Sequence, residues 1–98
     1  MTDLEELRKR IDEIDEEIVS LLEKRMEISE KVAEYKIANG KNVLDKEREK
    51  AKLDKVRSLT HNEFNAGAVT ELFDKILAMS RKKQYAIMAE KGIKGEED

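Results

Sequence analysis

Four basic residues of this chain have the types and spacings that suit an anion-binding pocket. Arg25 interrupts a regular run of hydrophobic residues, and Lys36 follows it eleven positions later, nearly three helical turns on, so both share one helix face. A guanidinium among apolar neighbours is costly unless an anion meets it. Arg8 and Arg48 add two further guanidinium groups. Because arginine binds carboxylates through paired hydrogen bonds and lysine acts as a compact cation, the four residues predict a site for a small polyanion.

Acidic and neutral polar residues accompany these cations. Asp45, Arg48 and Glu49 stand at positions i, i+3 and i+4 and therefore share the face of one helical turn, where Asp45 also suits an N-cap. Ser80 and Gln84 continue the apolar line of a later helix, where polar groups belong only if a partner satisfies them. Glutamine can donate to an ether or carbonyl oxygen without changing its charge. We therefore add these acidic and neutral residues to the candidate site, with hydrogen bonding between helices as the plainer alternative for Ser80 and Gln84.

The residue inventory argues against covalent catalysis. The chain has no cysteine, and its one histidine, His61, falls in an expected loop without the Glu-x-x-His pattern of metal sites in helical cores. We expect any reaction to proceed by positioning and electrostatic stabilisation, with neither a metal nor a cofactor.

A long N-terminal helix must carry most of the cations. Thr2-Asp3-Leu4-Glu5 matches a capping box and Asn39-Gly40 a left-handed stop, so we expect one helix from Leu4 to Ala38. Steps of three and four residues trace a heptad seam along it, formed by Leu7, Ile11, Ile14, Ile18, Leu21, Arg25, Ile28, Val32 and Tyr35. A helix of about 52 Å would protrude from a compact chain with a radius of gyration of about 12.6 Å. The seam therefore predicts packing against a second chain.

Arg8 fits the pocket only through such a pairing. It lies seventeen residues before Arg25, about 25 Å away along the helix axis, too far for one small ligand to touch both within one chain. In a two-fold homodimer, Arg8 of one subunit would complete the pocket of the other.

Two further helices follow. Asp45 is expected to cap the second, which fades near Ser58 to Thr60, and a third begins at about Ala66 after a loop over His61 to Asn65. With no proline and only four glycines, the all-α class is the natural prediction. We expect residues 1–91 to form one helical domain and residues 92–98 a flexible tail.

The composition argues against nucleic-acid and membrane partners. A net charge of -3 with interleaved signs provides no basic stripe for a nucleic-acid backbone. No apolar stretch approaches eighteen residues, and Met1 runs directly into Thr2, Asp3 and Leu4 without an apolar leader. We expect a cytoplasmic protein without a membrane partner.

The joint pattern of these motifs resembles the all-helical class of chorismate mutases, including the mutase domains of bifunctional prephenate-forming enzymes. The likeness runs from about Leu4 to Gln84, and its motifs are residues 7–15 (LRKRIDEID), 21–25 (LLEKR), 32–36 (VAEYK), 45–49 (DKERE) and 80–84 (SRKKQ). This resemblance implies an intertwined homodimer of three-helix chains that rearranges chorismate to prephenate, a Claisen rearrangement within one molecule.

The resemblance also implies a role for each candidate residue. Arg25, with Arg8 of the partner chain, would bind the two substrate carboxylates, and Arg48 would lie beside them. Lys36 and Gln84 would bond the ether oxygen on which negative charge develops. Of the remaining residues, Glu49 and the backbone near Asp45 would hold the ring hydroxyl, and Ser80 would support a carboxylate. A neutral Gln84 implies activity without a requirement for acid.

Two alternatives remain open. The chain could be a non-catalytic helical dimerisation or partner-binding module in which Arg25 only sets the register of the seam, and exposed basic residues taken singly are usually just solvated. It could also be a relative that keeps the pocket but acts on isochorismate.

Overall fold

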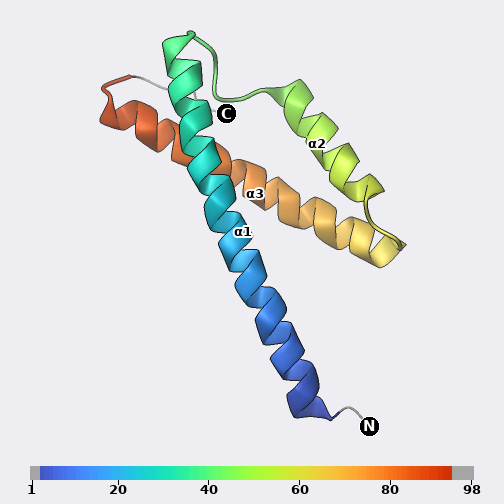
Figure 1. The fold of residues 1–98 in the computed structure, drawn as a ribbon. Coiled ribbons are helices and arrows are strands. Elements are labelled where there is room, and N and C mark those ends of the chain that lie inside the picture. The colour runs from blue at the N-terminus through green and yellow to red at the C-terminus, as the bar shows by residue number, and fades with distance from the viewer. Residues whose placement is uncertain (1–2, 94–98) are drawn as a thin grey trace.

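The described part of the chain folds into three helices. The computed structural model describes residues 3–93, which form α1 (Leu4–Ala38), α2 (Lys46–Ser58) and α3 (Glu63–Glu90), with no strand among them. Figure 1 shows α1 as one long rod that α3 crosses along its C-terminal half, with α2 beside α3. The all-α prediction and the bounds of the long first helix are confirmed.

Local capping defines both ends of α1. The side chain of Asp3 accepts the backbone N–H of Glu6 at 2.8 Å, so Asp3 is the N-cap. We had expected the capping box to start at Thr2, which lies outside the described residues. At the other end Gly40 has a φ of +62°, the left-handed conformation that the predicted stop requires.

The start of α2 agrees with the sequence. Oδ1 of Asp45 accepts the backbone N–H of Arg48 at 3.0 Å, and the helix runs from Lys46 to Ser58. The cap turns the backbone abruptly from loop to helix, which places the residues of the first turn at a defined position over α3.

The start of α3 differs from our expectation. The helix begins at Glu63, three residues before the predicted Ala66. Oδ1 of Asn62 accepts the backbone N–H of Asn65 at 2.8 Å. Because this cap satisfies a free donor of the first turn, the polar segment that we expected to be a loop is helical from Glu63 onward.

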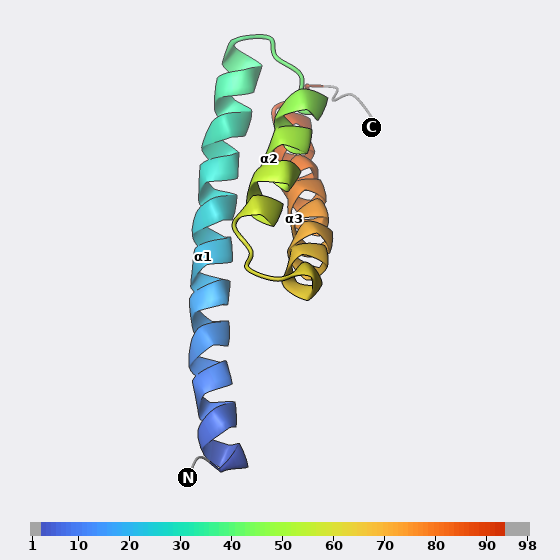
Figure 2. The ribbon, with the colours of Figure 1, turned by 90° about the vertical axis from the view of Figure 1, so that its right-hand side faces the viewer.

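The packing of the three helices leaves a cleft. Within residues 3–93, α1 and α2 each contact α3 but do not contact one another. Figure 2 shows α2 and α3 stacked alongside the C-terminal half of α1. The buried apolar residues that hold this arrangement together are few and mostly small: Ala33, Val43, Val56, Ala66 and Leu77. The cleft therefore lies between α1 and α2, with α3 as its floor.

The N-terminal half of α1 has no covering in the single chain. Every residue from Asp3 to Leu21 is exposed, and Figures 1 and 2 show this half extending beyond α2 and α3. The radius of gyration is 17.0 Å, against about 12.6 Å expected for a compact chain of this length. The apolar seam residues left in solvent here are Leu7, Ile11, Ile14, Ile18 and Leu21.

None of the helices within residues 3–93 is both long enough and apolar enough to cross a membrane.

Candidate active site

The cleft between α1 and α2 contains a cavity of about 320 Å³. Its walls come from the C-terminal half of α1, the α1–α2 loop, the first turns of α2 and the middle of α3. Seven of the eight predicted site residues line it: Arg25, Lys36, Asp45, Arg48, Glu49, Ser80 and Gln84. The fold therefore brings together side chains that are up to 59 positions apart in the sequence.

The eighth residue, Arg8, does not reach the cavity of its own chain. It lies on the exposed N-terminal half of α1, and the helix geometry keeps it about 25 Å from Arg25 along the axis. The unbroken course of α1 over both residues is what this calculated separation requires.

Arg25 meets a hydroxyl rather than a carboxylate. Its Nη1 donates to Oγ of Ser80 at 2.6 Å, and no acidic side chain in the described part of the chain pairs with it. Burial lowers the pKa of Arg25 from its usual value, and the positive charge of Arg48 lowers it further. A partly desolvated cation with a second cation beside it favours binding of an anion.

Ser80 is positioned to bridge protein and ligand. Its Oγ accepts from Arg25 and also, at the longer distance of 3.4 Å, from the hydroxyl of Ser29. A hydroxyl has one hydrogen and two acceptor lone pairs. With both lone pairs engaged, Ser80 retains its own O–H to donate, which suits an anionic acceptor in the cavity.

Lys36 is held by the backbone of the α1–α2 loop. Its Nζ donates to the carbonyl oxygen of Val43 at 2.6 Å, while two of its three hydrogens remain for other acceptors. Burial lowers the pKa of Lys36 from its usual 10.5, against the opposing effect of the carboxylates of Asp45 and Glu49. The ammonium group is therefore held in place by the loop. Because it is partly desolvated, binding of an anion would stabilise it.

Both acidic residues of the cavity have partners within the protein. Asp45 accepts the backbone N–H of Arg48 as the α2 cap, and Glu49 accepts from Nη1 of Arg81 on α3. The side chains of Arg81 and Glu49 are only 20% and 22% exposed. Both carboxylates still act on the charge of Lys36, whereas neither has a resolved effect on Arg25.

Gln84 has an unmet hydrogen-bonding atom. Its side chain lines the cavity, the residue is 6% exposed, and its Oε1 has no partner within the described structure. A buried polar group without a partner costs about 1–3 kcal/mol. A half-turn of the amide exchanges the acceptor for a donor at the same place, so Gln84 can offer either to a ligand.

The cavity as a whole is strongly cationic. Its acidic lining residues are Asp45 and Glu49, and its basic ones are Arg25, Lys36, Arg48, Lys52 and Arg81. Five positive charges against two negative ones leave an excess of three. In a confined cleft such an excess raises the affinity for a small anion with two negative charges.

Three polar lining residues received no role from the sequence: Ser29, Lys52 and Arg81. Lys52 follows Glu49 by three positions, so the i, i+3 rule could have found it. Ser29 was noted only as lying between Arg25 and Lys36. Arg81 gave no local signal, because it neighbours Ser80 and its direction depends on how α3 packs against α2.

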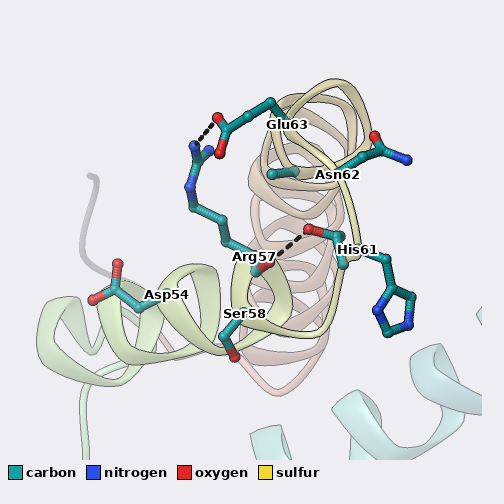
Figure 3. A pocket seen from close by; sticks show the side chains of 8 residues that line it. Asp54, Arg57, Ser58, His61, Asn62 and Glu63 are labelled. Atoms are coloured by element: carbon teal, nitrogen blue, oxygen red, sulfur yellow. Dashed lines mark hydrogen bonds and ion pairs between the residues drawn. The ribbon is translucent and has the colours of Figure 1, made fainter.

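A second, larger hollow of about 620 Å³ lies at the turn between α2 and α3. Figure 3 shows Arg57 and Glu63 pointing toward one another there, while the ring of His61 points away from them. Arg57 pairs with Glu63 at 3.4 Å, and all three residues are exposed. The charged groups of this hollow are exposed to solvent, and two of them pair with one another, so we assign the site to the cleft. Within residues 3–93, no group of three or more His, Cys, Asp or Glu residues could hold a metal ion.

Comparison with known proteins shows which family the chain belongs to. The family model for chorismate mutase type II matches residues 7–85. A bifunctional chorismate mutase/prephenate dehydratase from Buchnera aphidicola subsp. Schizaphis graminum is 40% identical over 87 residues, which are 88% of this chain and 23% of that protein. A chorismate mutase from Methanocaldococcus jannaschii is 45% identical over 56 residues, 57% of either chain. The chain thus spans less than two thirds of each relative. The resemblance inferred from the motifs is confirmed: the chain belongs to the chorismate mutase type II family.

Proposed function

We propose that this chain catalyses the rearrangement of chorismate to prephenate. In this reaction the ether C–O bond between ring and side chain breaks while a C–C bond forms within the same molecule. Atoms and electrons balance internally, so no nucleophile, oxidant or co-substrate is needed. The enzyme has only to hold the reactive shape and stabilise the charge that develops on the ether oxygen.

The charge imbalance around Arg25 is the observation that carries this proposal. A half-buried guanidinium with Arg48 beside it and only the Ser80 hydroxyl as partner favours an anion, and a substrate carboxylate fits that requirement. Ser80 would donate its hydrogen to the same carboxylate.

Lys36 and Gln84 would act on the breaking bond. The two hydrogens that Nζ of Lys36 retains and the buried amide of Gln84 line the same cavity. Donors directed at the ether oxygen bind more strongly as its negative charge grows, which lowers the barrier rather than the ground state. Glu49 would accept a hydrogen bond from the ring hydroxyl, with the backbone near Asp45 beside it.

We further propose that the active form is an intertwined homodimer. The exposed apolar half of α1 supports this, because a stripe of this length is normally covered in a soluble protein. A second copy would bring its Arg8 to the cavity and supply the remaining carboxylate partner. Residues 1–91 would form the mutase domain, and the cytoplasm remains the expected compartment.

The direct test follows chorismate loss by ultraviolet absorbance with purified protein. We expect a rate well above the uncatalysed background, with isochorismate measured in parallel to distinguish the two substrates. Arg25→Ala and Lys36→Ala should each remove most of the turnover. Lys24→Ala, which changes an exposed neighbour of Arg25, serves as the matched control and should retain it. A rate equal to background with chorismate would refute the proposal.

A further inference from the structure

The ion pair between Arg81 and Glu49 connects α3 to α2 at the wall of the cavity. Nη1 of Arg81 donates to Oε1 of Glu49, and both residues line the cavity. A second pair leaving α3 provides a comparison: Lys83 and Glu30 meet at 3.1 Å with side chains 44% and 46% exposed, about twice the 22% of Glu49. Neither Lys83 nor Glu30 lines the cavity. Arg81 therefore both joins α3 to α2 and lines the cavity of the candidate site.

The carboxylate of Glu49 lies near several cations that attract it. It stands on the first turn of α2 beside Arg48, and its negative charge acts on Lys36, whose pKa it raises. A glutamate side chain with three rotatable bonds would turn toward any of these cations if nothing held it. A bond from a second helix restricts that choice, because Arg81 approaches from α3 rather than from the same turn.

The bond also leaves part of the carboxylate available. A carboxylate has about four acceptor positions on two oxygens. Arg81 engages Oε1, so the remaining capacity can accept the hydrogen of a hydroxyl group in the cavity. A carboxylate that is already oriented loses less entropy when it accepts that hydrogen bond.

We propose that Arg81 is a positioning residue that holds Glu49 in the orientation needed to accept a hydrogen bond from the substrate's ring hydroxyl. The inference rests on the proposed function and deepens it, because it assigns recognition of the hydroxyl to a pair of side chains on two helices. Arg81 acts through Glu49 and does not itself contact the reacting atoms.

The test is a double-mutant cycle on kcat/KM for chorismate. Arg81→Met removes charge and donors while keeping an unbranched chain, and Glu49→Ala removes the group that Arg81 holds. We expect Arg81→Met to lower kcat/KM by about tenfold or more in the wild-type background, because a charge-assisted bond is lost. In the Glu49→Ala background the same change should have less than a twofold effect. Lys83→Met is the matched control and should leave kcat/KM unchanged.

Arg81→Lys guards against a misfolded variant. Its ammonium can still reach a carboxylate, so it should recover at least threefold over Arg81→Met, and circular dichroism checks that each variant is helical. Multiplicative losses in the cycle, full activity of Arg81→Met, or failure of Arg81→Lys to recover activity would each overturn the inference. Wild-type protein without turnover would instead refute the proposed function, so the two failures are distinguishable.

Discussion

Lys36 is a partly buried cation whose charge is important for the proposed chemistry. Its ammonium group is partly desolvated and anchored by the carbonyl of Val43, and burial lowers its pKa despite the nearby carboxylates. The proposed role needs the charged form, because an ammonium group stabilises negative charge developing on an ether oxygen far better than a neutral amine does. Its pKa therefore sets the pH range in which the proposed chemistry can operate.

The first prediction concerns this pH range. Since the ammonium is the active form, kcat/KM should be high below the pKa of Lys36 and fall as pH rises through it, at a lower pH than the 10.5 of an ordinary lysine. Lys36→Arg, whose guanidinium stays charged, should lose this alkaline decline in whatever activity it retains. A pH profile of kcat/KM, with circular dichroism to confirm the fold, checks both. A wild-type profile that is flat up to 10.5 would remove Lys36 from the mechanism.

A second prediction at the residue scale concerns Gln84. In Gln84→Glu a protonated carboxyl can donate to the ether oxygen, whereas the carboxylate cannot. Activity of this variant should rise as pH falls through the pKa of the new carboxyl, while the wild type should show no such requirement for acid. At neutral pH we expect a loss of about 100-fold, comparable to the removal of one donor to a developing oxyanion. Equal activities at neutral pH would contradict the proposed role of Gln84.

At the scale of the element, the N-cap of α2 sets the position of the site residues on the first turn of that helix. Asp45 fixes where α2 begins, and the first turn that follows carries Arg48 and Glu49 into the cavity. Asp3 makes the same kind of cap on α1, with its bond to the N–H of Glu6 at 2.8 Å, but on the exposed end of that helix. The two caps are therefore a natural pair for separating stability from activity.

Replacing either cap by alanine should cost about 1 kcal/mol of helix or protein stability. Only Asp45→Ala should also lower kcat/KM, because it loosens the turn that presents Arg48 and Glu49. Asp45→Asn keeps an oxygen for the cap and should retain more activity than Asp45→Ala, although loss of the carboxylate lowers the pKa of Lys36 further. Urea unfolding and initial rates measure the two effects. If Asp3→Ala reduced turnover as much as Asp45→Ala, the distinction would fail.

At the scale of the whole molecule, the N-terminal half of the long helix α1 lacks a surface that covers its apolar seam. Asp3 to Leu21 contribute no buried residue in the single chain, although the apolar seam continues through them. A sequence that maintains such a stripe for this length gains stability only if another surface covers it. In the proposed homodimer, a second copy would cover this stripe with its own and would bring its Arg8 to the cavity.

Mixed dimers test that arrangement. Arg8→Ala and Arg25→Ala chains should each be nearly inactive alone. After unfolding and refolding together, a mixed dimer has one cavity with Arg25 of one chain and Arg8 of the other, so random pairing should restore about a quarter of wild-type activity. Light scattering should give twice the chain mass of 11.4 kDa. No recovery in a mixture shown to contain mixed dimers would show that Arg8 does not complete the cavity of the partner chain.

Much of the secondary structure could be predicted from residues that are close together in the sequence. The seam, the cap at Asp45 and the stop at Gly40 depend on residues within a few positions of one another, so the sequence alone predicted α1 and α2 closely. The same reasoning failed at the start of α3, because the polar cluster before Ala66 suggested a loop while the cap made by Asn62 favours helix. The candidate residues of the cavity could be found from the sequence because each lies on a definable face of its own helix or, in the case of Asp45, caps one.

Only the tertiary structure decided how those faces meet. The contact of Arg25 with Ser80 and that of Arg81 with Glu49 both follow from how α1 and α2 lie across α3. Helix crossing geometry is a property of packed surfaces and not of spacing along one chain. The sequence determined which groups this protein carries and on which side of each helix, whereas packing determined which of them meet and which charges are left for a ligand.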